Sequence, residues 1–356
     1  MHLLLLLVLS VLGIVFESHP SKRSRKTEAI LMAIVLSLFA GLRGYSVGID
    51  VKSYVAYFYQ DINLTIKDIL TLNTSFAQAT DPVFHCFLHL LSYISKDPQI
   101  MLFSIGILLS IALVYYAYTE SSSIYVVVLF FITLRIFPFT LTGLRQTMAM
   151  SFLLFALVEI KKSHSISFFV LTFVAALFHS SAILFLVAFP LIKIQRTKEL
   201  IISVSAVILA DIVSRYALSS WLASLVFSNK YAHYYSILSF EKGSFSSTFL
   251  VVGAIFIFGC IYRERICVIN KEHDENLRLG IVAVSLSVVG QMIPSMFRLS
   301  YYFMIVLFPM FNDILKATLS HKSYLIVIWL ASILLIAQYL ILGPGAGTEP
   351  YVFFWM

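Results

Sequence analysis

Long apolar runs separated by short polar segments make up most of the chain. A helix that crosses a bilayer core of about 30 Å needs about 20 mostly apolar residues, and many of the runs approach that length. We therefore predict an all-α, polytopic transmembrane protein, with one membrane domain over residues 1–356 and about twelve spans. The predicted spans are 1–16, 28–42, 99–118, 124–139, 142–160, two short arms within 166–192, 199–218, 248–262, 279–297, 300–315 and 324–342.

Composition supports this interpretation. Apolar residues make up 60% of the chain and charged residues 12%, whereas a soluble domain carries about 25% charged residues. The net charge of +7 comes from basic residues in short loops, so we expect it to orient the spans and not to bind nucleic acid. The three cysteines are irregularly spaced and predict neither a disulfide framework nor a zinc site.

The distribution of basic residues predicts the orientation. Four basic residues within 17–26 indicate a cytoplasmic loop, so both termini and the loops 43–98 and 219–247 are expected outside. The stretch 82–95 is short for a span, and we interpret it as an interfacial helix, with a re-entrant segment as the alternative. Because 166–192 is basic at both ends, it is predicted to form a hairpin whose tip lies near His179. Tyrosines and tryptophans in 219–247 suit an interfacial belt or sugar-stacking platforms.

Several ionisable residues are predicted at the outer membrane boundary, where charge is expensive and often functional. Outer segments normally avoid arginine, so this concentration indicates an anionic partner. Simpler interpretations remain for each residue: an arginine that snorkels to lipid headgroups, a core histidine, or an aspartate that pairs with Arg43 or caps a helix. The residues are Arg43, Asp50, Arg135, Arg145, His179 and Arg298.

The motifs that are absent narrow the chemistry. The sequence has no DxD pair for a metal-bound nucleotide sugar, no phosphate-binding P-loop, no HExxH and no GxSxG. Arginine offers a planar fork that suits phosphate oxygens. Two or more arginines can stabilise a diphosphate leaving group as its charge develops. We therefore expect a reaction on an anionic lipid that needs neither a metal nor a cofactor.

Five segments, in order along the chain, resemble the EpsG-like branch of bacterial polysaccharide polymerases. Their family patterns are R-x-x-x-V-G-x-D-x-x-x-Y, D/E-P-G-F, G-x-R-Q, F-H-x-S-A and R-x-x-Y-Y, and the second has Val83 in place of glycine. The matching segments are Arg43 to Tyr54, Asp81 to Phe84, Gly143 to Gln146, Phe178 to Ala182 and Arg298 to Tyr302.

The resemblance implies a Wzy-type glycosyltransferase with a GT-C-like membrane architecture. Such an enzyme transfers a growing glycan from undecaprenyl diphosphate to a lipid-linked repeat unit at the outer face of the bacterial inner membrane. It extends O-antigen, capsule or exopolysaccharide chains, and its expected partners are membrane lipid, a flippase and a chain-length regulator. The alternatives are a flippase or transporter of the same lipid-linked sugars and a membrane O-acyltransferase.

Roles for individual residues follow as hypotheses. Asp50 or His179 is expected to take the proton from the acceptor hydroxyl. Arg145 and Arg298, helped by Arg43, are expected to hold the donor diphosphate. The full set of expected diphosphate- or glycan-binding residues is Arg43, Arg135, Arg145, Gln146, Arg298, Tyr301 and Tyr302.

Overall fold

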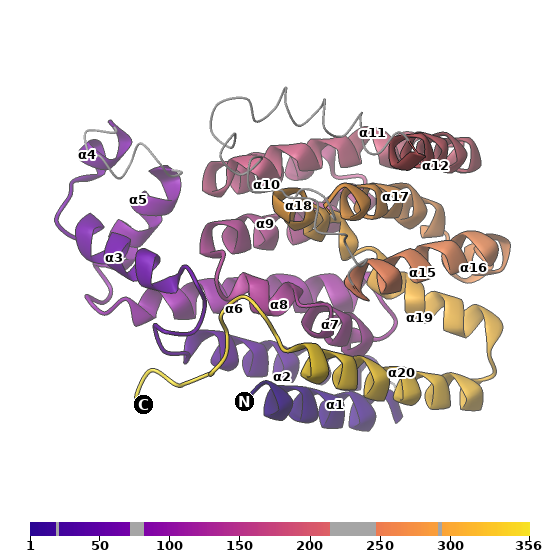
Figure 1. Ribbon diagram of the computed structural model, residues 1–356, viewed down its shortest axis with the longest axis horizontal. Helices are drawn as coiled ribbons and strands as arrows, with labels where there is room; N and C mark the ends of the chain where they lie inside the picture. The colour runs from indigo at the N-terminus through magenta and orange to yellow at the C-terminus, as the bar shows by residue number, and fades with distance from the viewer. Residues whose placement is uncertain (19–20, 72–81, 214–246, 291–293) are drawn as a thin grey trace. The chain divides into compact units, whose positions relative to one another are not determined.

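The computed structural model describes residues 1–18, 21–71, 82–213, 247–290 and 294–356. Regular secondary structure within these ranges is helical, apart from an isolated antiparallel bridge between Arg43 and Phe353 (Figure 1). The all-α prediction is therefore confirmed for this part of the chain. Residues 219–246 of the second predicted outer loop lie outside the described residues, as does Asp81.

The chain divides into two compact units. The first comprises residues 1–186 and 319–356, and the second comprises residues 187–318. The first unit contains α1 (His2–Ser18), α2 (Lys22–Gly41), α3 (Val51–Asp61), α4 (Ile66–Leu70), α5 (Pro82–Leu91), α6 (Gln99–Glu120), α7 (Ile124–Thr133), α8 (Ile136–Thr140), α9 (Leu144–Lys161), α10 (Ser165–Phe178) and α20 (His321–Leu342). The 3₁₀ helix η2 (Ser180–Val187) follows α10.

Small residues let α2 and α6 approach closely. Added to Gly106, a Cβ atom would lie 2.8 Å from the Cβ of Ala40, and one added to Gly41 would lie 2.7 Å from the Phe103 ring. Such contacts leave no room for a larger side chain. This is how helices pack in a membrane, where van der Waals contact replaces the hydrophobic driving force.

Residues predicted on one side of the membrane gather at one end of the first unit. At the start of α2, Arg25 donates to the main-chain oxygens of Tyr118 (3.0 Å) and Ser121 (2.6 Å). Lys161 contacts Glu120 over 2.6 Å. These residues all belong to segments predicted to be cytoplasmic or at the cytoplasmic ends of spans, and the side of the membrane on which they lie stays a prediction.

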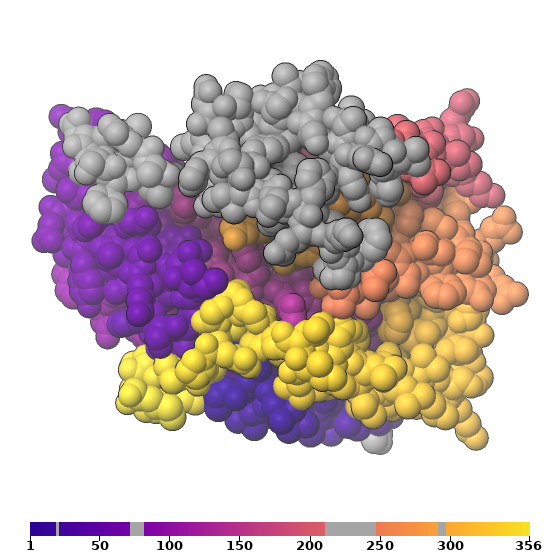
Figure 2. Space-filling view, in the orientation of Figure 1, coloured from indigo at the N-terminus to yellow at the C-terminus, as the bar shows by residue number. Residues whose placement is uncertain are grey.

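Residues predicted outside gather at the other end of α2. Here His2 Nε2 donates to the main-chain oxygen of Thr348 over 3.3 Å, and His2 Nδ1 accepts from the Tyr339 hydroxyl over 2.9 Å. The C-terminal segment, yellow in Figure 2, lies over the indigo N-terminal helices. The tail after α20 is therefore a packed part of the fold.

The structure corrects one predicted span and the predicted position of Arg298. The stretch 124–139 is not one helix, because the chain leaves α7 at Leu134 and passes through Arg135, whose φ of 66° is left-handed. Pro138 then lies in the first turn of α8, where its missing N–H costs nothing. Arg298 was predicted at a turn but lies within α18 (Pro294–Met304), a helix that begins at a proline.

The basic residues predicted in the loop 17–26 also lie elsewhere. They occupy the first turns of α2, which begins where the Ser21 side chain accepts from the main-chain N–H of Ser24. In the described part of the chain, α6 and α20 have the length and apolar character to cross a membrane, and several apolar helices are shorter. The number of twelve spans stays a prediction.

The second unit is also helical. Its described elements are α11 (Ala188–Lys193), α12 (Thr197–Val213), α15 (Ser247–Ile261), α16 (Arg263–Ile269), α17 (His273–Gly290), α18 (Pro294–Met304) and α19 (Leu307–Thr318). Arg278 holds the connection before α12, since it donates to the main-chain oxygens of Leu191 (2.7 Å) and Ile192 (2.8 Å) and to the Thr197 hydroxyl (2.7 Å). These bonds join 193–198 to 263–278, two segments that were predicted to be cytoplasmic.

Candidate functional site

The loop that follows α2 is held by the C-terminal tail. The N–H of Gly44 donates to the Val352 oxygen over 2.9 Å, and the N–H of Phe354 donates to the Leu42 oxygen over 3.0 Å. These bonds flank the bridge between Arg43 and Phe353. The loop thus enters α3 from a supported position, although it carries little regular structure of its own.

Gly48 lets this loop approach the turn before α9. Its φ of 109° is a conformation that L side chains rarely adopt, and a Cβ added there would lie 2.9 Å from the Leu141 oxygen. Two residues later, the N–H of Asp50 donates to the Thr142 hydroxyl over 2.9 Å. The glycine therefore brings Asp50, an exposed residue at the start of α3, beside the residues that lead into α9.

Arg43 is buried below the same turn, with 1% of its surface exposed. One terminal nitrogen donates to the main-chain oxygen of Leu141 over 2.9 Å, and the other donates to that of Ala40. Burial lowers the pKa of Arg43 to about 10, so it stays protonated at neutral pH. Its Nε has no partner within the described residues. Arg43 therefore joins the end of α2 to the turn before α9.

Tyr54 connects α3 to the first turn of α9. Its hydroxyl accepts hydrogen bonds from both the main chain and the side chain of Arg145, and the negative charge of Asp50 lies close enough to affect it. Burial raises the pKa of Tyr54, so this hydroxyl remains protonated at neutral pH. The half-buried Arg145 is the second residue of α9, next to the buried Gln146. Its guanidinium therefore adds to the positive end of a long helix.

His179 lies near the same end of α9. It caps the C-terminus of α10 and is half-buried. The preceding residue, Phe178, stacks on Phe152 of α9 with ring centroids 5.6 Å apart. Phe178 also shares an apolar cluster with Leu144 and Tyr54. The structure thus brings Asp50, Arg145, Gln146 and His179, all predicted from sequence, to one end of the first unit.

A buried pair in the neighbouring helices was missed by the sequence analysis. His85 Nδ1 donates to Asp61 Oδ2 over 2.8 Å, and the two side chains are 3% and 5% exposed. One turn later, His89 Nδ1 donates to the main-chain oxygen of Asp61 over 2.8 Å. Both histidines of α5 therefore bind the last residue of α3. The i, i+4 spacing of the histidines was the available signal, but the sequence did not indicate their partner.

The remaining predicted residues lie elsewhere. The Nη2 atom of Arg135 donates to the main-chain oxygen of Leu342, at the end of α20, over 2.7 Å. Arg298 is exposed on α18 of the second unit. On the same helix, Tyr301 and Tyr302 are 8% and 3% exposed. These three residues belong to a different compact unit from Arg145. Their part in a common site stays a prediction.

Comparison with known proteins gives one match. The model of a family described as the EpsG family matches residues 28–352, nearly the whole chain. No curated protein and no solved structure matches. The matched range includes the loop after α2, the first turn of α9 and the helix that carries Arg298.

Proposed function

The chain belongs to the EpsG family, and we propose that it is a membrane glycosyltransferase that polymerises lipid-linked polysaccharide repeat units. The family indicates a polysaccharide polymerase, and the apolar helices indicate a membrane protein. The finer proposal is a donor glycan on undecaprenyl diphosphate and an acceptor repeat unit on the same lipid. The reaction is proposed at the outer face of a bacterial inner membrane.

One observation carries this proposal: Arg145, in the first turn of α9, binds the Tyr54 hydroxyl, and the charge of Asp50 lies close enough to affect the same hydroxyl. A cation and a helix N-terminus together favour a phosphate group. The nearby carboxylate of Asp50 can accept a proton. The arrangement therefore combines a diphosphate-binding group with a base, which is what glycosyl transfer from a lipid diphosphate requires.

The proposed reaction has one chemical step. Asp50 accepts the proton of the acceptor hydroxyl, whose oxygen attacks the anomeric carbon of the donor glycan. The bond between this carbon and the diphosphate oxygen breaks, and the diphosphate leaves with the electron pair. Arg145 stabilises the charge that develops on the leaving group, with Arg298 as the second proposed cation. His179 remains the alternative base.

Two residues have contacts that support an indirect role. Both terminal nitrogens of Arg43 bind main-chain oxygens, so we propose that Arg43 positions the turn before α9. The earlier expectation that it touches the diphosphate stays a prediction. Arg135 similarly binds the end of α20, which supports a role in holding the C-terminal tail near the site.

The test uses cells from which the gene has been deleted and in which variants restore it. Arg145→Ala should reduce polymerisation at least about 100-fold, because one group that stabilises transition-state charge contributes roughly 3 kcal/mol. On a gel of surface polysaccharide, the product should collapse to a single repeat unit. Arg23→Ala, at an exposed basic residue near the other end of α2, is the matched control and should leave long chains.

Other outcomes identify the alternatives. Normal chain lengths with Arg145→Ala, at equal membrane abundance, would contradict the assignment. A complete loss of surface repeats, with lipid-linked units retained inside the deletion strain, would identify a flippase. Unchanged chain length with loss of acyl groups would identify an O-acyltransferase.

A further inference from the structure

The C-terminal tail supports the loop that carries Asp50 at more than one point. Besides the bonds near the start of this loop, two main-chain bonds reach the residues just before Asp50. The N–H of Gly48 donates to the Gly347 oxygen over 2.9 Å, and the N–H of Ile49 donates to the Ala346 oxygen over 3.1 Å. The tail is therefore joined to the loop up to the residue that immediately precedes the proposed base.

The turn of the tail that makes these bonds is itself fixed in place. Thr348 is fully buried, and both its N–H (3.1 Å) and its hydroxyl (2.9 Å) donate to the Gly345 oxygen. The oxygen of Thr348 accepts from His2, the first residue of α1, over 3.3 Å. Because the turn is anchored to a helix, it can hold the loop and does not simply follow it.

Gly347 is the point where the tail and the loop approach most closely. Its φ of 66° is left-handed, and a Cβ atom added there would lie 2.7 Å from Cγ1 of Ile49 and 3.1 Å from the main-chain nitrogen of Ile49. The exposed Ile49 side chain can rotate away from such an atom. The main-chain nitrogen cannot move without moving Asp50, the next residue. A side chain at position 347 would therefore displace the proposed base.

We propose that Gly347 is a positioning residue for glycosyl transfer, through which the C-terminal tail holds the carboxylate of Asp50 in place. The proposal rests on the proposed function, in which Asp50 takes the proton of the acceptor hydroxyl. Gly347 itself touches no substrate. Arg145 is held by a separate contact with Tyr54, so a displaced Asp50 should slow the chemical step while the donor diphosphate still binds.

The kinetic test uses the full-length protein in liposomes, with lipid-linked repeat units isolated from the gene-deletion strain as substrate. Gly347→Ala should lower kcat at least about ten-fold, because a misplacement of about 1 Å can cost about 100-fold. KM should stay at the wild-type value, because the lost interaction belongs to the transition state. The matched control is Gly345→Ala. Its φ of 72° brings the same backbone strain, but an added Cβ would meet nothing within 4 Å, so kcat should be retained.

Two further measurements separate positioning from a general loss of stability. Hydrogen exchange of the amides in 43–50 should be about five-fold faster in Gly347→Ala, the change that corresponds to one hydrogen bond, and unchanged in Gly345→Ala. Ile49→Ala removes the side-chain atom nearest to an added Cβ. Combined with Gly347→Ala, it should restore part of kcat, which a variant that was only destabilised would not show.

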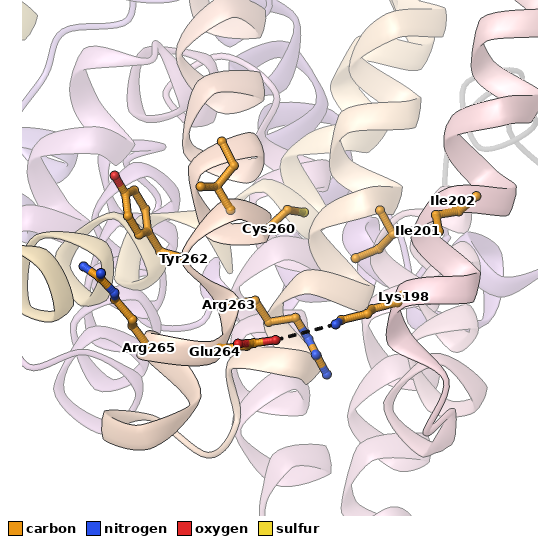
Figure 3. A pocket seen from close by; sticks show the side chains of 9 residues that line it. Lys198, Ile201, Ile202, Cys260, Tyr262, Arg263, Glu264 and Arg265 are labelled. Atoms are coloured by element: carbon orange, nitrogen blue, oxygen red, sulfur yellow. Dashed lines mark ion pairs between the residues drawn. The ribbon is translucent and has the colours of Figure 1, made fainter.

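Lys198→Gln provides a control in the other compact unit. Figure 3 shows Lys198 of α12 reaching Glu264 across a pocket of about 460 Å³. The two exposed side chains are 3.7 Å apart and make a weak pair. Loss of so weak a pair should leave kcat, KM and exchange of the loop at their wild-type values.

Several outcomes would overturn the proposal. These are a wild-type kcat in Gly347→Ala, an equal loss of kcat in Gly345→Ala, and a raised KM with unchanged kcat. Normal polymerisation by Arg145→Ala would instead refute the proposed function, and exchange of the loop would then decide whether the tail holds it. If Gly347→Ala does not reach the membrane, Thr348→Val replaces it, because it loosens the same turn without a clash. It should lower kcat at constant KM, and an unchanged kcat would overturn the proposal.

Discussion

Removal of the Asp61 carboxylate should loosen α5 from α3. The bond from His85 to Asp61 is 2.8 Å long, and both side chains are at most 5% exposed. Water therefore cannot replace the lost acceptor in Asp61→Ala, and a buried donor left without a partner costs about 1–3 kcal/mol. The bond from His89 to the main chain of Asp61 should remain, because it does not involve the side chain. We expect a local destabilisation of about 2 kcal/mol.

Hydrogen exchange measured by mass spectrometry on the reconstituted protein tests this value. A loss of about 2 kcal/mol raises the local opening constant about 30-fold, so amides of α3 and α5 should exchange faster by that factor. Those of α6 and α20 should not change. The matched control is Asp68→Ala, which removes an exposed carboxylate that caps α4 through Thr65 and should affect α4 alone.

A double-mutant cycle identifies the pair as the cause. Asp61→Ala, His85→Ala and the double variant should give a coupling energy of about 1–2 kcal/mol. Tyr54 lies on the same helix as Asp61 and binds Arg145, so polymerisation should fall in the single variants too. If α3 and α5 in Asp61→Ala exchange at wild-type rates, the buried pair does not hold these helices together.

Three further perturbations test other parts of the fold and site. Gly106→Val should destabilise the protein by about 1–3 kcal/mol, because the valine side chain would overlap Ala40. Thermal unfolding in detergent measures this loss. An unchanged Tm would contradict the close packing of α2 and α6. Gly48→Ala should lower polymerisation without lowering membrane abundance, because it strains the loop that carries Asp50; normal chain lengths on the gel would refute this. Partial burial raises the pKa of Asp274, but the Arg263 guanidinium outweighs it and lowers the pKa below the ordinary value of about 3.9. The pair therefore contributes stability above that pH and loses it as pH falls through the lowered pKa, so Asp274→Asn should flatten the acid side of the stability curve.

The apolar pattern predicted the long helices well. The predicted spans 99–118, 142–160 and 324–342 correspond to α6, α9 and α20 with shifts of a few residues at their ends. Hydrophobicity over a window of this length is a local property, so it can be read without knowledge of the fold. The points where helices are interrupted were harder to predict. Nothing in the stretch 124–139 indicates that Arg135 adopts a left-handed backbone conformation.

Contacts between distant segments set the limit of the prediction. The tail after α20 pairs with the loop after α2 across about 300 residues of sequence, and neither segment has a pattern that indicates the other. Likewise, no pattern in α3 or α5 indicates that Asp61 pairs with His85. Each segment read alone suggested an outer loop, a tail or an interfacial helix, whereas the structure packs each of them into the first unit.

The spacing of the two motifs nearest the candidate site has a common physical explanation. The motif from Arg43 to Tyr54 runs alongside the turn at Leu141 and Thr142 and the G-x-R-Q motif that follows it, from Gly143 to Gln146. Arg43 and Gly48 both approach the Leu141 oxygen, Asp50 binds Thr142, and Tyr54 binds Arg145.

A residue inserted between Gly48 and Tyr54 would therefore disturb the alignment in which Asp50 binds Thr142 while Tyr54 binds Arg145. Because the first motif runs along the turn before α9, its spacing is a requirement of packing as well as of chemistry. A substitution within it can lower activity by moving Asp50 or Arg145, even where the substituted side chain never touches substrate. Arg43 is the clearest case: Arg43→Lys keeps the charge but cannot bind Ala40 and Leu141 with two separate nitrogens. If Arg43 acts by position, this charge-conserving change should impair polymerisation nearly as much as Arg43→Ala.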